Sequence, residues 1–192
     1  MWPVALLGAG VALAYASTRG VANLTELKSR TDGRVCKVQN LPDKQQACEK
    51  LAEVRQNLDK LMQKYRDDPA TAADPRVKVL LDRYNPDNMC ENDINADSTS
   101  YSENKGDKIV VCLRDKAPPH RLVDTNTVMF VVLHEMAHLM TASLSTGKHT
   151  PEFWANFRRL LQDAAQIGIY QPVNYSHTPV SYCGMEITDS PL

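Results

Sequence analysis

The sequence is poor in aromatic residues and has no block of charge of one sign. Only 6% of its 192 residues are aromatic, and 22 Lys and Arg nearly balance 23 Asp and Glu, for a formal net charge of -1. Proteins that bind nucleic acid usually carry a basic patch, and those that bind single strands stack the bases on aromatic side chains. We therefore expect no nucleic acid partner. The length suits one domain with a full hydrophobic core.

Cysteines are also few, and their number is odd. The five are Cys36, Cys48, Cys90, Cys112 and Cys183. An odd number excludes a fully paired disulfide framework, and no two of them have the CxxC spacing that is typical of a cysteine zinc site. We expect reduced and mostly buried thiols, as in a cytosolic protein.

Charge is missing altogether from the start of the chain. Residues 2–18 are uncharged and nearly all apolar, and as a helix they would span roughly 25 Å. This predicts a transmembrane anchor over residues 1–18 that inserts into a lipid bilayer. A cleaved signal peptide, with its cut after Ala14-Tyr15-Ala16, and a helix buried in a soluble core are the alternatives. Positive charges follow the run, which predicts a single-pass membrane protein with its domain on the cytosolic side.

Residues 19–42 show no clear period and are predicted to be a juxtamembrane connector. The remaining residues, 43–192, form the predicted domain. Apolar residues at helical spacing predict helices that begin after the N-cap Asp43 and at Pro151. A shorter helix is predicted to begin at Pro75, and another after the N-cap Asp124, where residues 128–133 are uninterruptedly apolar. For the first helix, Gln46 lies three residues after Asp43, the spacing of a capping box.

Strand signals are confined to a short part of this domain. Residues 98–102 and 108–114 are predicted to pair as an antiparallel hairpin around the turn residues 104–106. The polar segment 85–97 is predicted to be a loop, and the tail, residues 173–192, shows no period. The sequence therefore predicts an α+β domain in which a small antiparallel sheet accompanies several helices.

The third predicted helix carries the motif with the clearest chemistry. His134 and His138 lie four residues apart, so they share one helix face and both imidazoles can bind one zinc ion. The carboxylate of Glu135, on the helix edge, can reach a zinc-activated water without binding the metal. A pair of core histidines is the alternative, but two histidines and a glutamate in an apolar helix are costly to bury without a shared partner.

A catalytic zinc takes three protein ligands and keeps one open position. His149 is the predicted third ligand because it follows a Gly-containing loop and precedes a helix, where the chain can fold back over the zinc helix. The other residues that could serve are His120, His177, Glu152 and Glu186. Of these, His177 is the second choice, and His120, beside two prolines, is expected in a surface loop.

The order of strand, HExxH helix, loop, third histidine and helix resembles the WLM, SprT and YgjP group of zinc peptidases. Their third histidine opens a motif similar to residues 149–154 of this chain. The chain also resembles metallopeptidases of nucleocytoplasmic large DNA viruses over residues 45–192. The segments that carry this second resemblance are 85–88, 99–101, 105–110, 134–138, 149–154 and 182–188. Together they imply a zincin-like fold around the HExxH helix.

The resemblance implies a zinc-dependent metallopeptidase that hydrolyses a protein or peptide substrate, with Glu135 as the catalytic residue. It also implies a membrane-anchored, virion-associated protein at a viral internal membrane, with capsid proteins as further partners. The alternative is a structural minor capsid or membrane protein that retains a zinc-binding peptidase fold. A protease of DNA-crosslinked proteins, as among some WLM and SprT members, has no support because no basic arm is visible.

Two further predictions concern the cleft. The strand over residues 108–114 is predicted to line it and to pair with an extended substrate; a strand packed on both sides is the alternative. Met185 is predicted to lie beneath the zinc site, in a turn closed by Gly184, with the Tyr182 hydroxyl near the open metal position as a donor to the oxyanion. The alternative is that this tail packs on the fourth helix.

Overall fold

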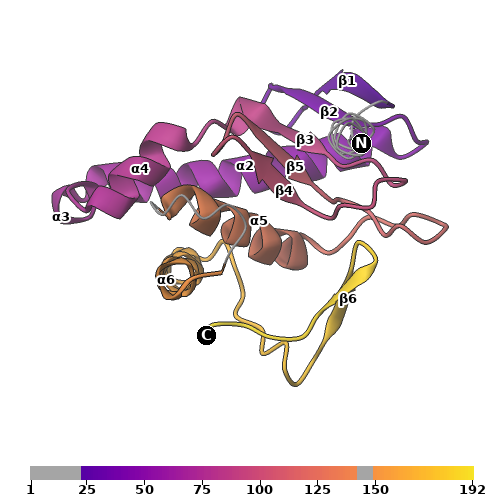
Figure 1. Cartoon of the computed structure of the whole chain (residues 1–192). Coiled ribbons are helices and arrows are strands. Elements are labelled where there is room, and N and C mark those ends of the chain that lie inside the picture. The colour runs from indigo at the N-terminus through magenta and orange to yellow at the C-terminus, as the bar shows by residue number, and fades with distance from the viewer. Residues whose placement is uncertain (1–22, 142–148) are drawn as a thin grey trace, which may run out of the picture.

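The structure, a computed structural model, describes residues 23–141 and 149–192. It has the predicted α+β architecture: in the view of Figure 1 the long helix α2 lies behind a small sheet, α5 and α6 lie below the sheet, and the C-terminal hairpin lies at the lower right. Helix α2 also contacts α5. The helices are α2 (Lys44–Asp67), α3 (Pro69–Ala72), α4 (Pro75–Arg83), η1 (Pro86–Asn88), α5 (Thr125–Met140) and α6 (Pro151–Gln166). The strands are β1 (Leu24–Lys28), β2 (Val35–Gln39), β3 (Met89–Glu91), β4 (Tyr101–Glu103), β5 (Lys108–Val111), β6 (Val180–Tyr182) and β7 (Met185–Ile187).

Helix α2 confirms the helix predicted after Asp43. Its apolar stripe is fully buried, Leu51, Leu58 and Met62 among it, and the helix ends before Pro69. The predicted capping box is wrong, because the Asp43 side chain makes no cap hydrogen bond. Its carboxylate pairs instead with the buried Arg114.

The central sheet has the strand order β3-β5-β4. Strands β4 and β5 pair antiparallel, which confirms the predicted hairpin. Residues 104–106 all have positive φ in its turn, and a Cβ on Gly106 would stand 2.6 Å from the Arg83 carbonyl oxygen. Strand β3 lies in the segment predicted to be a loop and pairs parallel to β5. Parallel partners lie far apart in the sequence, so the local turn-rich composition hid this strand.

The predicted connector, residues 19–42, is wrong over its described part. Strands β1 and β2 form an antiparallel hairpin, and Cys36 and Val38 of β2 are fully buried. Arg55 of α2 is buried beneath it, donates to the Val35 carbonyl oxygen at 2.9 Å and pairs with Asp32 at 2.9 Å. The hairpin was not predicted because few of its residues are buried. Its packing is completed by the ion pair with Arg55, which belongs to a distant helix.

The prediction of reduced thiols is also wrong. Cys36 is bonded to Cys48, with Cα atoms 5.4 Å apart, and Cys112 to Cys183, with Cα atoms 6.1 Å apart. Cys90 is a buried free thiol. The partners are 12 and 71 residues apart in the sequence, and connectivity of this kind cannot be deduced from sequence alone.

The prediction for the C-terminal tail can be compared with the structure, whereas the prediction for the N-terminal anchor cannot. The C-terminal tail is not aperiodic, because β6 and β7 form a hairpin around Cys183 and Gly184, both at positive φ; its strands are only three residues long, too short for a periodic signal. The predicted anchor, residues 1–18, lies outside the described residues. Within the described ranges, no helix is long and apolar enough to cross a membrane.

Candidate metal centre

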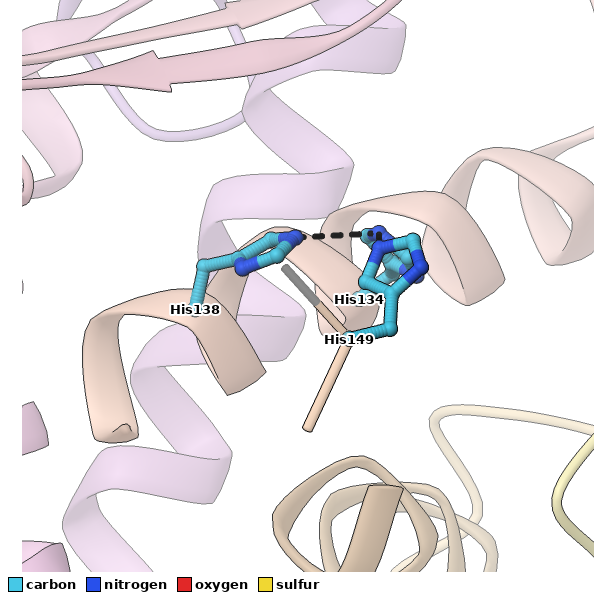
Figure 2. Close-up of side chains that lie close together, drawn as sticks. All are labelled: His134, His138 and His149. Carbon is cyan, nitrogen blue, oxygen red and sulfur yellow. Dashed lines mark hydrogen bonds between the residues drawn. The ribbon is translucent and has the colours of Figure 1, made fainter. Parts of the chain in front are cut away.

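Helix α5 sets the positions of the first two histidines. The Asp124 side chain caps the helix by accepting a hydrogen bond from the Thr127 amide at 3.0 Å. Because His134 and His138 follow at a spacing of four, their imidazoles face the same side, and their Nε2 atoms are 3.2 Å apart. The dashed line in Figure 2 joins these two nitrogens.

The chain returns to this point at the start of α6. Thr150 caps α6, its side chain accepting from the Phe153 amide at 3.2 Å, and Pro151 occupies the first turn. This fixes His149 immediately before the helix, with its Nε2 3.2 Å from that of His134. Figure 2 shows the three imidazoles converging from α5 and from the segment that enters α6. The structure therefore brings together the three predicted ligands.

The chemistry of this cluster fits a metal ion. The ligand nitrogens of the three histidines all lie within 4.8 Å of one another, and two nitrogens bound to one tetrahedral zinc are roughly 3.3 Å apart. One imidazole N–H can donate to only one neighbour, so His134 cannot satisfy both of its neighbours by hydrogen bonding. A cation accepts all three lone pairs at once.

The protonation of the cluster points the same way. Burial lowers the pKa of His134 to about 3 and that of His138 to about 4, and neighbouring histidines act in the same direction. Both imidazoles are therefore neutral near pH 7, and the neutral form is the one that binds metals.

The other histidines and glutamates considered as ligands are not part of this cluster, which is the group of possible metal ligands found within the described residues. His120 lies in the loop after Pro119, with its Nδ1 3.1 Å from the Asp115 carbonyl oxygen. His177 is exposed beside Asn174. Glu186 is exposed on β7, and Glu152 lies in the first turn of α6.

Phe153, which is fully buried, forms the floor of the cluster. Its ring centroid lies 4.8 Å from that of His134, 4.4 Å from that of His138 and 4.6 Å from that of His149. The prediction that Met185 lies beneath the site is wrong, because Met185 is 50% exposed.

Glu135 lies beside the cluster with only 6% of its surface exposed. Burial raises the pKa of its carboxyl group to about 7, partly offset by hydrogen bonds from the side chain and backbone of Ser102 in β4. A carboxyl group with a pKa near the working pH can both accept and return a proton. Sequence reasoning identified Glu135 but missed Ser102, whose contact with α5 depends on the tertiary fold.

Comparison with known proteins now decides the family. Residues 82–187, more than half of the chain, match the WLM domain. This chain belongs to the WLM domain family. Over 98% of its length it is 30% identical to a protein of Acanthamoeba polyphaga mimivirus, covering 95% of that protein. It is also 34% identical over 83 residues to a protein of Invertebrate iridescent virus 6, covering 43% of this chain and 44% of that protein.

Among solved structures, this WLM domain resembles Wss1 from Saccharomyces cerevisiae. The match has a TM-score of 0.51 and 19% identity, and it covers 68% of this chain and 86% of that one. At this identity the likeness concerns the fold. The α+β fold predicted from the motif order is thus confirmed, as is the resemblance to viral WLM proteins.

A cavity of about 340 Å³ adjoins the metal cluster of this WLM domain, and we call it the apolar pocket. Helices α5 and α6, the segment before β4 and the C-terminal hairpin all contribute to it. Its lining residues are Thr99, Ser100, Phe130, Val131, His134, Glu135, His149, Trp154, Phe157, Tyr182, Met185, Ile187 and Asp189. The tail of the WLM domain is therefore a wall of the site, and it does not simply pack on α6.

Tyr182 anchors this wall. Its side chain is 1% exposed, and its hydroxyl lies 2.9 Å from the Cys112 carbonyl oxygen and 2.7 Å from the Ser100 hydroxyl. Burial raises the pKa of Tyr182 well above its usual range. Because the hydroxyl donates its one proton to Cys112, this arrangement does not support the predicted role as a donor to an oxyanion.

The predicted substrate-pairing strand is also corrected. Strand β5 is the central strand, paired with β3 on one side and β4 on the other, so its backbone is not open to a peptide. The edge strands of this sheet are β3 and β4, and Thr99 and Ser100, just before β4, line the apolar pocket. The sequence did not reveal which strands lie at the edges of the sheet. β-branched residues give the strongest strand signal, and they are concentrated in the central strand β5.

Proposed function

We propose that this WLM protein is a zinc-dependent peptidase. The observation that carries the proposal is the convergence of three imidazoles beside the buried carboxyl group of Glu135. A site that only stabilises a fold closes its metal with protein ligands, whereas three histidines leave a position open. Zinc suits this all-imidazole set and needs no fourth protein ligand.

In this proposal His134, His138 and His149 hold the metal, and Phe153 keeps their rings in place. When bound, zinc lowers the pKa of a water molecule and polarises a substrate carbonyl group. Glu135 accepts the proton from the attacking water and delivers it to the leaving amine. Ser102 orients the Glu135 carboxyl group during both transfers.

We propose further that the chain is held on a membrane by residues 1–18 and is carried in a virion, where capsid proteins are its neighbours. The uncharged N-terminal run and the viral relatives support this. Two disulfides favour an oxidising compartment, which weighs against placing the domain on the cytosolic side. A structural minor capsid protein is the alternative, but a scaffold has no need of Glu135. Mass spectrometry of purified virions would test both the location and the native N-terminus.

Elemental analysis of the purified protein tests the metal centre. We expect about one zinc per chain, and clearly weaker retention in His149→Ala. The matched control is His177→Ala, which changes an exposed histidine outside the cluster and should keep its zinc. Equal retention in both variants would remove His149 from the site.

Cleavage of an unfolded protein such as casein tests the activity. The zinc-loaded wild-type protein should cut it, and Glu135→Gln should not, although it keeps its zinc. Zinc retention without cleavage by the wild-type protein would favour the structural alternative.

A further inference from the structure

We propose that the apolar pocket is a specificity subsite that receives one large apolar side chain of the polypeptide substrate. This inference rests on the proposed peptidase function and names the substrate class that the same site selects. The pocket adjoins the metal cluster, because His134, Glu135 and His149 belong to its lining. A side chain seated in it therefore belongs to a residue close to the bond that is cut.

The composition of the lining selects the class of side chain. Phe130 and Val131 come one turn before His134 on α5, Phe157 comes from α6, and Ile187 comes from β7. Although Thr99, Ser100 and Asp189 also line the pocket, most of its surface is apolar. Such a surface favours the burial of apolar area and gives few partners to a buried charge or amide. The cavity volume of about 340 Å³ is at the lower end of ligand sites, roughly 300–1,000 Å³, which suits a single side chain.

The mouth of the pocket gives a second and independent observation. Trp154 is 41% exposed and Met185 is 50% exposed, and they are two of the four large apolar side chains that the described residues leave exposed. Both line this pocket. The other large apolar residues of the described chain are buried at least in part, so two exposed ones at a single mouth indicate a surface that a ligand covers.

The wall that carries Met185 and Ile187 is held in place. The disulfide between Cys112 and Cys183 ties the hairpin turn to the end of β5, and the Tyr182 hydroxyl bonds to Cys112 and Ser100. A wall fixed on both sides keeps the pocket's width nearly constant, and a constant width is what allows a pocket to discriminate by size.

The test separates binding from cleavage. The probes are capped octapeptides of Ala and Gly whose one central residue is Phe, Leu, Ala or Asp. Binding is measured with zinc-loaded Glu135→Gln, so that no peptide is cut, by the fluorescence of Trp154 at the pocket mouth. The chain has two Trp residues, and Trp2→Phe makes Trp154 the single reporter. We expect the Phe and Leu peptides to bind at least about tenfold more tightly than the Ala peptide.

A matched pair of variants checks the location. Met185→Asp places a charge at the mouth, and Val35→Asp makes the same change on β2 at a residue that is 53% exposed and outside the pocket. Both positions are exposed, so both variants should fold. Met185→Asp should abolish most of the preference for Phe and Leu, and Val35→Asp should leave it unchanged. Loss of the preference in both variants, or in neither, would overturn the assignment.

The outcomes for the two proposals differ. If the four peptides bind Glu135→Gln equally, or none binds, the subsite is wrong, whatever the protein cleaves. If the Phe and Leu peptides bind preferentially but zinc-loaded wild-type protein cuts none of them, the subsite stands and the peptidase proposal fails. If the wild-type protein cuts the Phe and Leu peptides at least about tenfold faster than the Ala peptide, both stand.

Discussion

Two buried regions of this protein treat charge in opposite ways. In one of them, which we call the scaffold region, the buried guanidinium groups of Arg55 and Arg114 pair with Asp32 at 2.9 Å and with Glu91 at 2.8 Å. At the metal centre, no basic side chain of the described chain pairs with Glu135, whose partner is the neutral Ser102. A buried charge without a partner is costly, so the two regions follow different rules.

The ion pairs of the scaffold region form within the chain itself, whereas the imidazoles of the metal centre offer ligands to a cation. Ion pairs within one chain fix β1–β2, β3 and α2 to one another whether or not a ligand is present. At the centre, burial instead lowers the pKa values of His134 and His138 and raises that of Glu135, so in each case the charged form is disfavoured. Large pKa shifts are common where a protein binds a ligand or catalyses a reaction. A bound cation would supply the positive charge that no basic side chain of the described chain provides to Glu135.

The comparison is tested most strongly by the two buried glutamates. Glu135→Gln should lower the rate of peptide cleavage by roughly 10²–10⁴-fold, the usual contribution of a general base. Its free energy of unfolding without metal should stay within about 1 kcal/mol of the wild-type value, as for changes away from structural ion pairs. With a pKa of about 7, the buried carboxyl group gains little from being ionised near neutral pH, so an amide of the same shape changes the stability little. Cleavage kinetics and urea unfolding give the two numbers.

Glu91→Gln makes the same chemical change in the scaffold region, and it should lower the stability of the protein without lowering its zinc content. It leaves Arg114 buried with Asp43 as its remaining partner, and breaking a buried pair costs roughly 3–5 kcal/mol. We expect a loss near the lower end of that range in urea unfolding, and unchanged zinc content in the protein that remains folded. A loss below about 1 kcal/mol would show that this pair does not hold the scaffold, since exposed pairs contribute that little.

Zinc itself should stabilise the protein less than the scaffold pair does. At a free zinc concentration of 100 times Kd, binding to the native state adds about 2.7 kcal/mol. Thermal unfolding with zinc and with a chelator measures this difference. The Glu91→Gln variant should gain the same increment as the wild type, because Glu91 is not among the metal-binding residues, whereas His134→Ala should gain much less.

The smallest effect concerns the cap that holds His149. Thr150→Ala removes the acceptor of the Phe153 amide and should cost about 1 kcal/mol of stability. An equal loss in zinc binding would weaken the affinity roughly fivefold, because His149 is fixed by the same turn. Thr188→Ala, at an exposed position of the tail, is the matched control. Isothermal titration with zinc would show whether the cap acts on the metal centre at all.

What the sequence could predict in this protein is what depends on neighbours along the chain. The spacing of His134 and His138 determines their common face, whatever the rest of the fold does. The apolar stripes that predict α2 and α6, and the N-cap and apolar run that predict α5, are equally local. The position of His149 near the HExxH helix was predictable because it lies between a loop and the start of a helix, where the chain can fold back over the HExxH helix.

What escaped prediction depends on contacts between distant segments. Such contacts are the parallel pairing of β3 with β5, the hydrogen bonds from Ser102 to Glu135 and the two disulfides. In each of them, the local sequence around one partner does not identify the other. The N-terminal hairpin was missed for the same reason, because Arg55, which lies beneath it, belongs to α2. The floor of the metal centre was assigned to Met185 by resemblance, whereas packing gave that place to Phe153.

The Cys112–Cys183 bond makes a covalent ring of the chain between these two residues. His134, Glu135, His138 and His149 all lie within this ring. A single backbone cut anywhere inside it opens the ring without releasing either fragment, so all the residues of the metal centre stay on one molecule. For a protein proposed to cut polypeptides, this means that one cleavage of its own catalytic segment need not disperse its active site. Such a nick would show on a denaturing gel as two fragments only after reduction.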